Sequence, residues 1–194
     1  MPSFDLRGIR VAKYSVSDKN VTYSESALLG DAMNCNLELR FAEGRLYAES
    51  KLSEYMKLAT GGTVSIGVKY IPNVVQEMLY GAKEKTRTIS TKAVKGLSFS
   101  TKDIANYVGV AFYAPDKIDG ETKYTCVFVA KTLFGPPSMA YQTKGDTITF
   151  NTPTTTGEFL GDDTEAENLI ETAVCDSEEE AIAWTKFVLG VTAQ

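Results

Sequence analysis

The sequence predicts an α+β protein that is mostly antiparallel β-sheet. Apolar and polar residues alternate over residues 36–49 and again over 63–70, and two segments within 107–134 are rich in Val, Phe and Tyr, all of which is typical of strands. Only two short stretches carry an apolar stripe with helical spacing. The 194 residues contain no linker rich in Pro, Gly or Ser and no internal repeat, so we predict a single domain over residues 1–194.

The first predicted pair of strands is a hairpin over residues 34–50, with Glu43-Gly44 as its two-residue turn. In this register Leu37, Leu39 and Phe41 share an apolar face that we expect to point to the core. The opposite face is polar. We expect it to turn five side chains away from the core: Glu38, Arg40, Arg45, Tyr47 and Glu49.

A third strand and a short helix follow this hairpin. Alternation over residues 63–70 predicts the strand, and Gly61-Gly62 before it is interpreted as a turn. Asn73 can cap the helix, and Gly81 is a typical stop signal at its end. The apolar stripe of the helix consists of Val74, Val75, Met78 and Leu79.

The region after the helix is the most basic part of the chain. Residues 83–102 contain six Lys or Arg and a single acid before Lys102, namely Glu84, and their pattern predicts a loop. The turn-rich residues 115–120 favour a second hairpin around them. Further strands are expected at 107–114, 122–134, 146–152 and 154–159.

The C-terminal segment is acidic and ends in a helix. Residues 158–194 hold ten acids and one base, whereas residues 1–157 hold 19 bases against 15 acids. Ser177 and Glu180 match the capping box that begins a helix. The apolar face of this helix consists of Ala181, Trp184, Phe187, Val188 and Val191, and we expect Trp184, Phe187 and Val188 to anchor it.

The basic and acidic segments are predicted to meet between copies of the chain. Each exposed ion pair contributes only ~0.2–1 kcal/mol, but a symmetric assembly repeats the contact many times. The alternative is that both segments are solvated surface. The candidate contact residues are Lys83, Lys85, Arg87, Asp162, Asp163 and Glu165.

The chain lacks residue types that many catalytic and metal sites need. It contains no His, which excludes Ser-His-Asp triads and His-ligated zinc. Cys35, Cys126 and Cys175 are widely spaced, so they indicate neither a disulfide framework nor a thiolate metal site, and they suit a reducing compartment. Glycine-rich phosphate loops are absent from the sequence. We therefore predict no enzyme, no catalytic residue, no cofactor and no metal site.

Two acidic features offer weaker alternatives. Residues 161–165 could hold a hard cation, although an exposed acidic turn is favoured. Glu38 opposite Glu49 could form a glycosidase-like carboxylate pair, but Arg40 would keep Glu49 ionised. The start of the chain does not match a signal peptide and no apolar run is long enough for a bilayer, so we expect cytosolic synthesis and no membrane partner.

A distinctive motif lies at residues 141–154, which read YQTKGDTITFNTPT and lead into Thr156-Gly157. This stretch resembles the major tail proteins of long-tailed bacteriophages, in which a Tyr-Gln-Thr-Lys-Gly-Asp segment leads into a strand rich in Thr and Pro. The chain departs from the family at residues 51–52 and in its basic insert before Tyr107. Four further segments follow the family's order: 8–12, 44–49, 75–81 and 131–137.

The resemblance implies a tail tube subunit, a structural protein of the virion. Its fold would be a barrel-like two-sheet β-sandwich with a short flanking helix and a C-terminal helix. Its copies would form stacked hexameric rings around a lumen that conducts DNA during ejection, and the polar hairpin face would line this lumen. Partners would be further copies of the chain, other tail proteins such as the tape measure and terminator proteins, and DNA in non-specific passage. The chain would reside in the virion tail and, during assembly, in the host cytoplasm.

Three other classes of protein remain as alternatives. The inner tube of a contractile injection particle shares the tail tube fold. A monomeric ligand-binding β-barrel and a carboxylate hydrolase belong to different classes. Size-exclusion chromatography with electron microscopy separates these, because uniform rings or tubes would exclude the last two.

Overall fold

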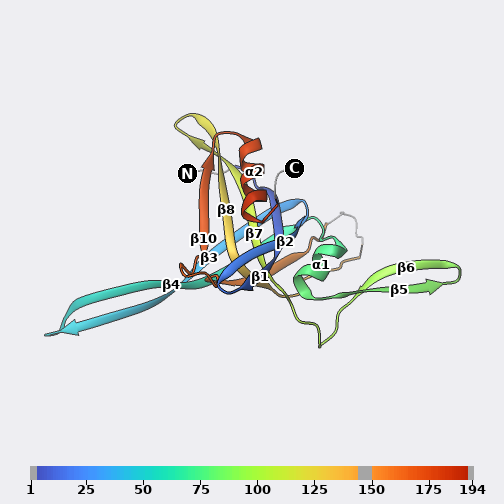
Figure 1. Cartoon of the computed structure of the whole chain (residues 1–194), viewed down its shortest axis with the longest axis horizontal. Coiled ribbons are helices and arrows are strands. Elements are labelled where there is room, and N and C mark those ends of the chain that lie inside the picture. Colours follow the sequence, from blue (N-terminus) through green and yellow to red (C-terminus); the bar gives the residue numbers. More distant parts are fainter. Residues whose placement is uncertain (1–3, 144–149, 192–194) are drawn as a thin grey trace.

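A computed structural model describes residues 4–143 and 150–191. The described residues form ten strands and two short helices (Figure 1), which confirms the mostly antiparallel α+β class. The strands are β1 (Arg7–Ser17), β2 (Asn20–Leu28), β3 (Ala32–Ala48), β4 (Lys51–Val68), β5 (Lys83–Ile89), β6 (Lys92–Ser98), β7 (Tyr107–Ile118), β8 (Glu121–Phe134), β9 (Thr154–Leu160) and β10 (Ile170–Cys175). The helices are α1 (Asn73–Tyr80) and α2 (Glu178–Val188).

Eight of these strands form one sheet in the order β2-β1-β7-β8-β9-β4-β3, with β10 also paired to β8. The long strand β8 pairs along one edge with β7. Its other edge is shared, because the middle of β8 pairs with β10 and its last residues pair with β9. Strands β5 and β6 form a separate two-stranded sheet.

The main hydrophobic core lies between the large sheet and α1. Val64, Ile66 and Val68 are fully buried on the core side of β4, as the alternation predicts. Phe134 and Phe159 are also buried there, and burial of a large apolar side chain stabilises a fold by about 1.5–3 kcal/mol. In α1, Val75, Met78 and Leu79 are buried but Val74 is exposed, so the predicted stripe is one residue too wide.

The ends of α1 follow the sequence signals in part. Gly81 adopts a left-handed conformation (φ 69°) as the C-cap, which is the expected role of glycine at this position. Asn73 is the first helical residue and does not cap the helix; Pro72 is the N-cap, and no side chain makes the capping hydrogen bond.

Helix α2 packs on the opposite side of β7 and β8. Its Ala181 is buried against Tyr113 and Cys126 of the strands. Leu189, directly after the helix, is buried in a second cluster with Ala111 and Ala130, whose small side chains allow this end to approach the sheet closely. The Ser177 hydroxyl accepts a hydrogen bond from Glu180 N (3.2 Å), which confirms this part of the predicted cap.

The predicted anchor of α2 is wrong in one residue. Trp184 and Val188 are half-buried and pack against the cluster beneath the helix. Phe187, however, is 77% exposed, because the helix turns this position away from the sheet. Thr185 and Leu189 take its place in the buried face.

The predicted hairpin turn at Glu43-Gly44 is wrong. Strand β3 runs straight through these residues, and the chain reverses at Glu49 and Ser50, whose φ angles of 49° and 60° are typical of a tight turn. The partner strand is β4, and Gly61-Gly62 lies within that strand, not in a turn. Near Gly44 the apolar residues change from one side of β3 to the other. This change marks the point at which the hairpin has left the core.

The basic segment is also regular structure instead of a loop. Its residues 83–98 form the β5–β6 hairpin, which projects away from the body of the molecule. The strands predicted within 107–134 are confirmed and extend to a turn at Asp119-Gly120. The strand candidate at 146–152 falls partly outside the described residues, and its described part, 150–152, is not a strand.

Candidate assembly surfaces

The outer side of β3, β4 and β9 forms a polar face. Glu38 lies beside Thr63, which lies beside Glu158, and the next row has the same polar character. Arg40 Nη2 is 3.4 Å from Glu158 Oε1, and Asn36 Nδ2 donates to Glu38 Oε1 at 2.8 Å. We call this surface the polar sheet face; its residues are Asn36, Glu38, Arg40, Thr63, Ser65, Thr156 and Glu158.

The five residues predicted for one polar hairpin face do not share a face. Successive side chains of a strand point to opposite sides, and β3 is continuous through all of them except Glu49. Glu38 and Arg40 therefore lie on the polar sheet face, whereas Arg45 and Tyr47 point to the other side. Glu49 lies in the turn, so it does not oppose Glu38, which pairs with Thr63 instead.

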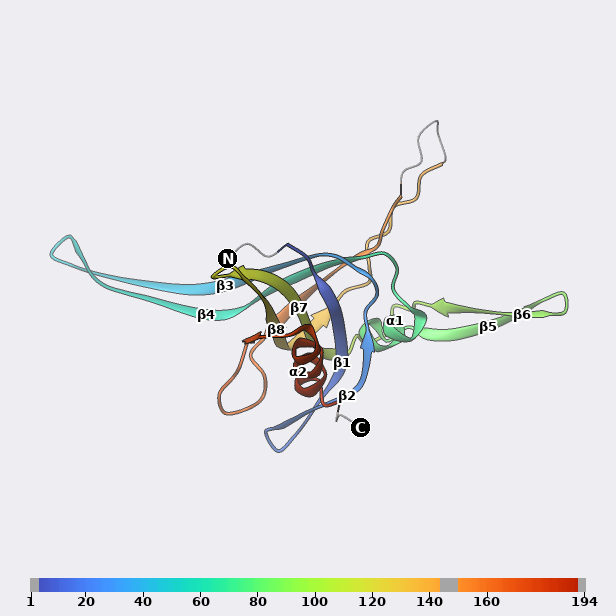
Figure 2. The same ribbon diagram turned by 90° about the horizontal axis from the view of Figure 1, so that it is seen from above.

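The outer half of the β3–β4 hairpin extends from the body as an arm (Figures 1 and 2). We define the distal arm as residues 41–60, which are all exposed. One side of it is apolar: Leu46, Met56 and Leu58 point there, each more than half exposed. Leu58 pairs with Ala42 and Met56 pairs with Gly44, so no large neighbour across the ladder covers these two side chains; Leu46 pairs with Glu54. Leu39 and Phe41 are also exposed, contrary to the expected core-facing role, whereas Leu37 packs against the core.

The other side of the distal arm carries a charged cluster. Glu43 lies 3.3 Å from Lys57 Nζ and 3.6 Å from Arg45 Nη2. Lys57 Nζ also lies 4.3 Å from the centre of the Phe41 ring, within the range of a cation–π contact. A hydrogen bond from Tyr55, followed by one from Lys57, lowers the pKa of Glu43. This side of the arm is therefore satisfied by its own residues.

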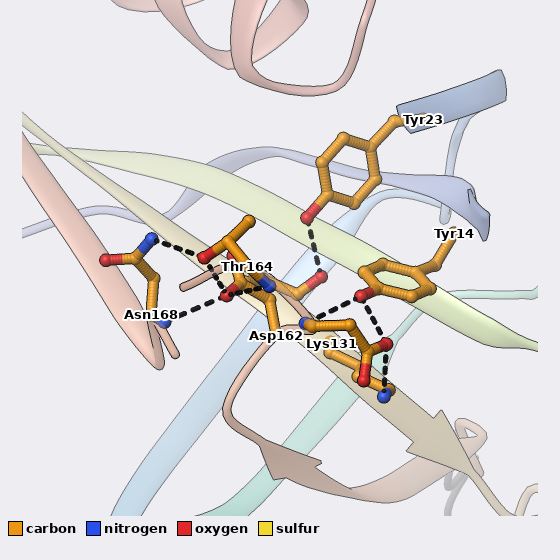
Figure 3. A network of polar contacts seen from close by, with 8 residues as sticks. Tyr14, Tyr23, Lys131, Asp162, Thr164 and Asn168 are labelled. Atoms are coloured by element: carbon orange, nitrogen blue, oxygen red, sulfur yellow. Dashed lines mark hydrogen bonds and ion pairs between the residues drawn. The ribbon is translucent and has the colours of Figure 1, made fainter. Parts of the chain in front are cut away.

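A polar network holds the acidic loop after β9 (Figure 3). Asp162 is buried and its Oδ1 accepts hydrogen bonds from Thr164 N (3.2 Å), Thr164 Oγ1 (2.6 Å) and Asn168 N (3.0 Å). These bonds fold the loop back on itself. Among the described residues, no three His, Cys, Asp or Glu side chains form a group that could hold a metal ion.

The neighbouring Asp163 belongs to a second part of this network. Its Oδ2 accepts from Lys131 Nζ and from the Tyr14 hydroxyl, both at 2.7 Å. Lys131 also lies over the rings of Tyr14 and Tyr107, at 5.3 Å and 4.9 Å. The loop is thereby tied to β1 and β8.

The structure places the predicted contact residues in different settings. The β5–β6 hairpin and the acidic loop after β9 lie far apart in space (Figure 2), so they do not pair within one molecule. Asp162 and Asp163 are engaged by their own chain, as described above. Glu165 is exposed and lies 3.5 Å from Lys19, and Lys83, Lys85 and Arg87 are exposed on β5.

We expect the Asp163→Asn variant to lose stability near neutral pH and to approach the parent in acid. The hydrogen bond from Lys131, and then that from Tyr14, lowers the pKa of Asp163 below its ordinary 3.8. A lowered carboxyl pKa stabilises the fold above pH 3.8, and this contribution is lost as the pH falls through the folded-state value. Urea unfolding of both proteins between pH 7 and pH 2.5 measures this. A deficit that does not depend on pH would contradict the ion pair.

Two of the three cysteines are neighbours beneath α2. Cys126 Sγ and Cys175 Sγ are 3.7 Å apart and form a hydrogen bond, not a disulfide. Burial, followed by the hydrogen bond with Cys175, raises the pKa of Cys126 to about 12. A thiol with so high a pKa is a poor nucleophile at neutral pH, so Cys126 is a packing residue.

Comparisons with known proteins assign no family to the chain: no model of a known protein family matches it, and no curated protein matches it. Within residues 4–143 and 150–191, neither helix is long and apolar enough to cross a membrane.

Proposed function

We propose that this chain is a self-assembling structural protein, the tube subunit of a bacteriophage tail. The observation that carries the proposal is the distal arm, whose apolar side is left exposed by the residues that the structure describes. An isolated two-stranded hairpin is marginally stable in water, and exposed apolar surface of this kind is typical of an interaction site. Further copies of the chain would cover the arm.

The sheet topology supports an assembly in a second way. Strands β2 and β3 end the order of the large sheet, so each has an edge without a strand partner among the described residues. Unpaired edges promote association unless they are covered, and a closed ring of subunits covers them. The two ends of the curved sheet, β2-β1-β7 and β9-β4-β3, both contribute to the main core, which suits the two-sheet sandwich of a tail tube.

The polar sheet face is the surface that suits a lumen. Its hydroxyl, amide and charged groups are compatible with water, and the Ser65 and Thr156 hydroxyls lie 3.2 Å apart on it. Glu38 and Glu158 outnumber Arg40 on this face and leave it negatively charged, which repels the phosphates of passing DNA. Of the five residues predicted to face a lumen, this placement keeps Glu38 and Arg40.

We expect tubes of the Glu38→Lys, Glu158→Lys variant to retain duplex DNA at low salt, whereas parent tubes do not. The two reversals change the face from repulsive to attractive for phosphate, and retention should disappear as salt rises. Co-sedimentation with DNA at about 0.05 M and 0.5 M salt measures this. The control is Glu165→Lys, Glu167→Lys, which makes the same charge change in the acidic loop. Equal retention by both variants would count against the lumen.

Size-exclusion chromatography with light scattering, followed by electron microscopy, tests the proposal as a whole. Rings or tubes of uniform diameter are the expected result. A monomer at high concentration would overturn it and favour a ligand-binding β-barrel. A sheath around the tube in intact particles would instead favour the inner tube of a contractile injection particle.

A further inference from the structure

The β5–β6 hairpin separates its charges between its two faces. Alternation along β5 and its register with β6 place Lys83, Lys85, Arg87 and Lys92 on one face. None of these four takes part in an ion pair with another described residue. On the opposite face Lys95 is paired with Glu84 at 2.9 Å. We call the first face the cationic face.

The cationic face also carries two apolar side chains near the tip of the hairpin. Ile89 and Val94 lie on it and are 64% and 49% exposed. Together with Lys85 and Arg87 they line a shallow hollow of about 200 Å³. A phosphate backbone offers nothing apolar for these two side chains, whereas a protein interface typically combines an apolar centre with a charged rim. The face therefore suits a protein surface that is apolar and ringed by acids.

The chain carries such a surface beside α2. A groove of about 610 Å³ lies between α2, β2 and β8, and Glu171 of β10 contributes to its wall. Glu179 is exposed in the first turn of α2, about 12 Å along the helix axis from Phe187. The groove is otherwise lined mainly by apolar side chains, including Tyr23, Phe128, Trp184, Phe187 and Val188. We call this surface the α2 groove.

The two surfaces cannot meet within one molecule. The β5–β6 hairpin projects away from α2 in both perpendicular views (Figures 1 and 2). The partner of each surface must therefore lie on another molecule. A contact between two different patches is head-to-tail, and repetition of a head-to-tail contact generates closed rings or filaments.

We propose that the cationic face of one copy docks into the α2 groove of the next copy, with Ile89 against Phe187 and with Lys85 and Arg87 facing Glu171 and Glu179. This inference rests on the proposed function, because it names the contact that joins neighbouring subunits. It replaces the sequence-based pairing with Asp162 and Asp163, which are occupied within their own chain, by acids that are exposed.

A mixed cross-link tests the contact directly. Two single variants, Ile89→Cys and Phe187→Cys, are prepared separately, mixed in equal amounts and oxidised with oxidised glutathione, which accepts two electrons as the disulfide forms and is released as two thiols. Both positions are largely exposed, so the variants should fold. A disulfide-linked dimer that contains both new cysteines is expected in the mixture. The control replaces Ile89→Cys with Ile104→Cys, which is even more accessible but lies outside the hairpin.

Charge exchange provides an independent test. Lys85→Glu with Arg87→Glu should raise the concentration needed for assembly at least about tenfold, which corresponds to ~1.4 kcal/mol. Adding Glu171→Lys and Glu179→Lys should restore part of the loss, whereas Lys102→Glu with Lys117→Glu, the same charge change elsewhere, should have little effect. The difference should shrink between about 0.05 M and 0.5 M salt, as the Debye length falls from roughly 14 Å to 4 Å.

The outcomes separate this contact from the proposed function. Rings that form without the mixed cross-link, or that tolerate the charge reversal at low salt, would overturn the contact and leave the tube subunit standing. A parent protein that stays monomeric would overturn both. Duplex DNA that binds the parent but not the Lys85→Glu, Arg87→Glu variant, with assembly unchanged, would assign the cationic face to phosphate and also overturn the contact.

Discussion

Replacement of Leu46, Met56 and Leu58 by Ser is expected to leave the chain folded but to prevent its assembly. These side chains lie outside the core and are more than half exposed, so their loss removes little from the stability of the monomer. If a neighbouring subunit covers them, full burial of each contributes about 1.5–3 kcal/mol to the contact. The concentration needed for assembly should therefore rise on the order of a hundredfold or more.

The matched control replaces Val74, Ile104 and Met139 by Ser. These three side chains are similarly exposed but lie outside the distal arm. Sedimentation velocity measures assembly, and thermal unfolding measures the fold. Rings formed by the arm variant at the concentration of the parent would remove the main support for the proposed function, as would an equal loss in the control.

Gly62→Ala is expected to lower the free energy of unfolding by about 3 kcal/mol or more, which is at the upper end for overpacking of a core. Gly62 lies within β4, and a Cβ there would overlap the Glu38 carbonyl oxygen and the ring of Phe159. Phe159 is fully buried and cannot move without disturbing the core.

Gly44→Ala is the matched control, since it makes the same change in the same hairpin. A Cβ at Gly44 has no atom within 4 Å, so we expect its free energy of unfolding to match the parent within about 0.5 kcal/mol. Urea denaturation of the two variants measures the difference. Equal stability would show that β4 can shift away from Phe159 at little cost.

Elements whose pattern is set by the core could be predicted from the sequence. Residues 63–68 alternate because the main core covers one side of β4, and Ser177 caps α2 because the cap depends only on local residues. The prediction of a turn at Glu43-Gly44 is wrong because the core does not set the pattern there. The arm has left the core there, so alternation no longer reports which side is buried, and the apolar side of the hairpin changes.

The candidate site could be predicted only in part. The opposite charges of the two segments are visible in the sequence, but which acids are available is not. In the sequence, Asp162 and Asp163 look as available for an outside contact as Glu171 and Glu179. Only the folded loop shows that Thr164 donates to Asp162 and that Lys131 donates to Asp163. The cationic face could not be predicted from the sequence either, because the register of β5 against β6 decides which residues share it.

The shared edge of β8 has a mechanical consequence for the polar sheet face. Strand β9 ends opposite Lys131 and strand β10 begins opposite Val129, while Ala130 between them donates its N–H to Leu169 O at 3.2 Å. Strands β9 and β10 thus lie end to end along the same edge of β8. Neither strand can shift toward the other along β8 without displacing it. A slip of β9 would carry Thr156 and Glu158 out of line with Ser65 and Thr63. The acidic loop connects β9 to β10 at this point. It therefore keeps β9 from shifting and so holds the polar sheet face in register, although the loop contributes no side chain to that face.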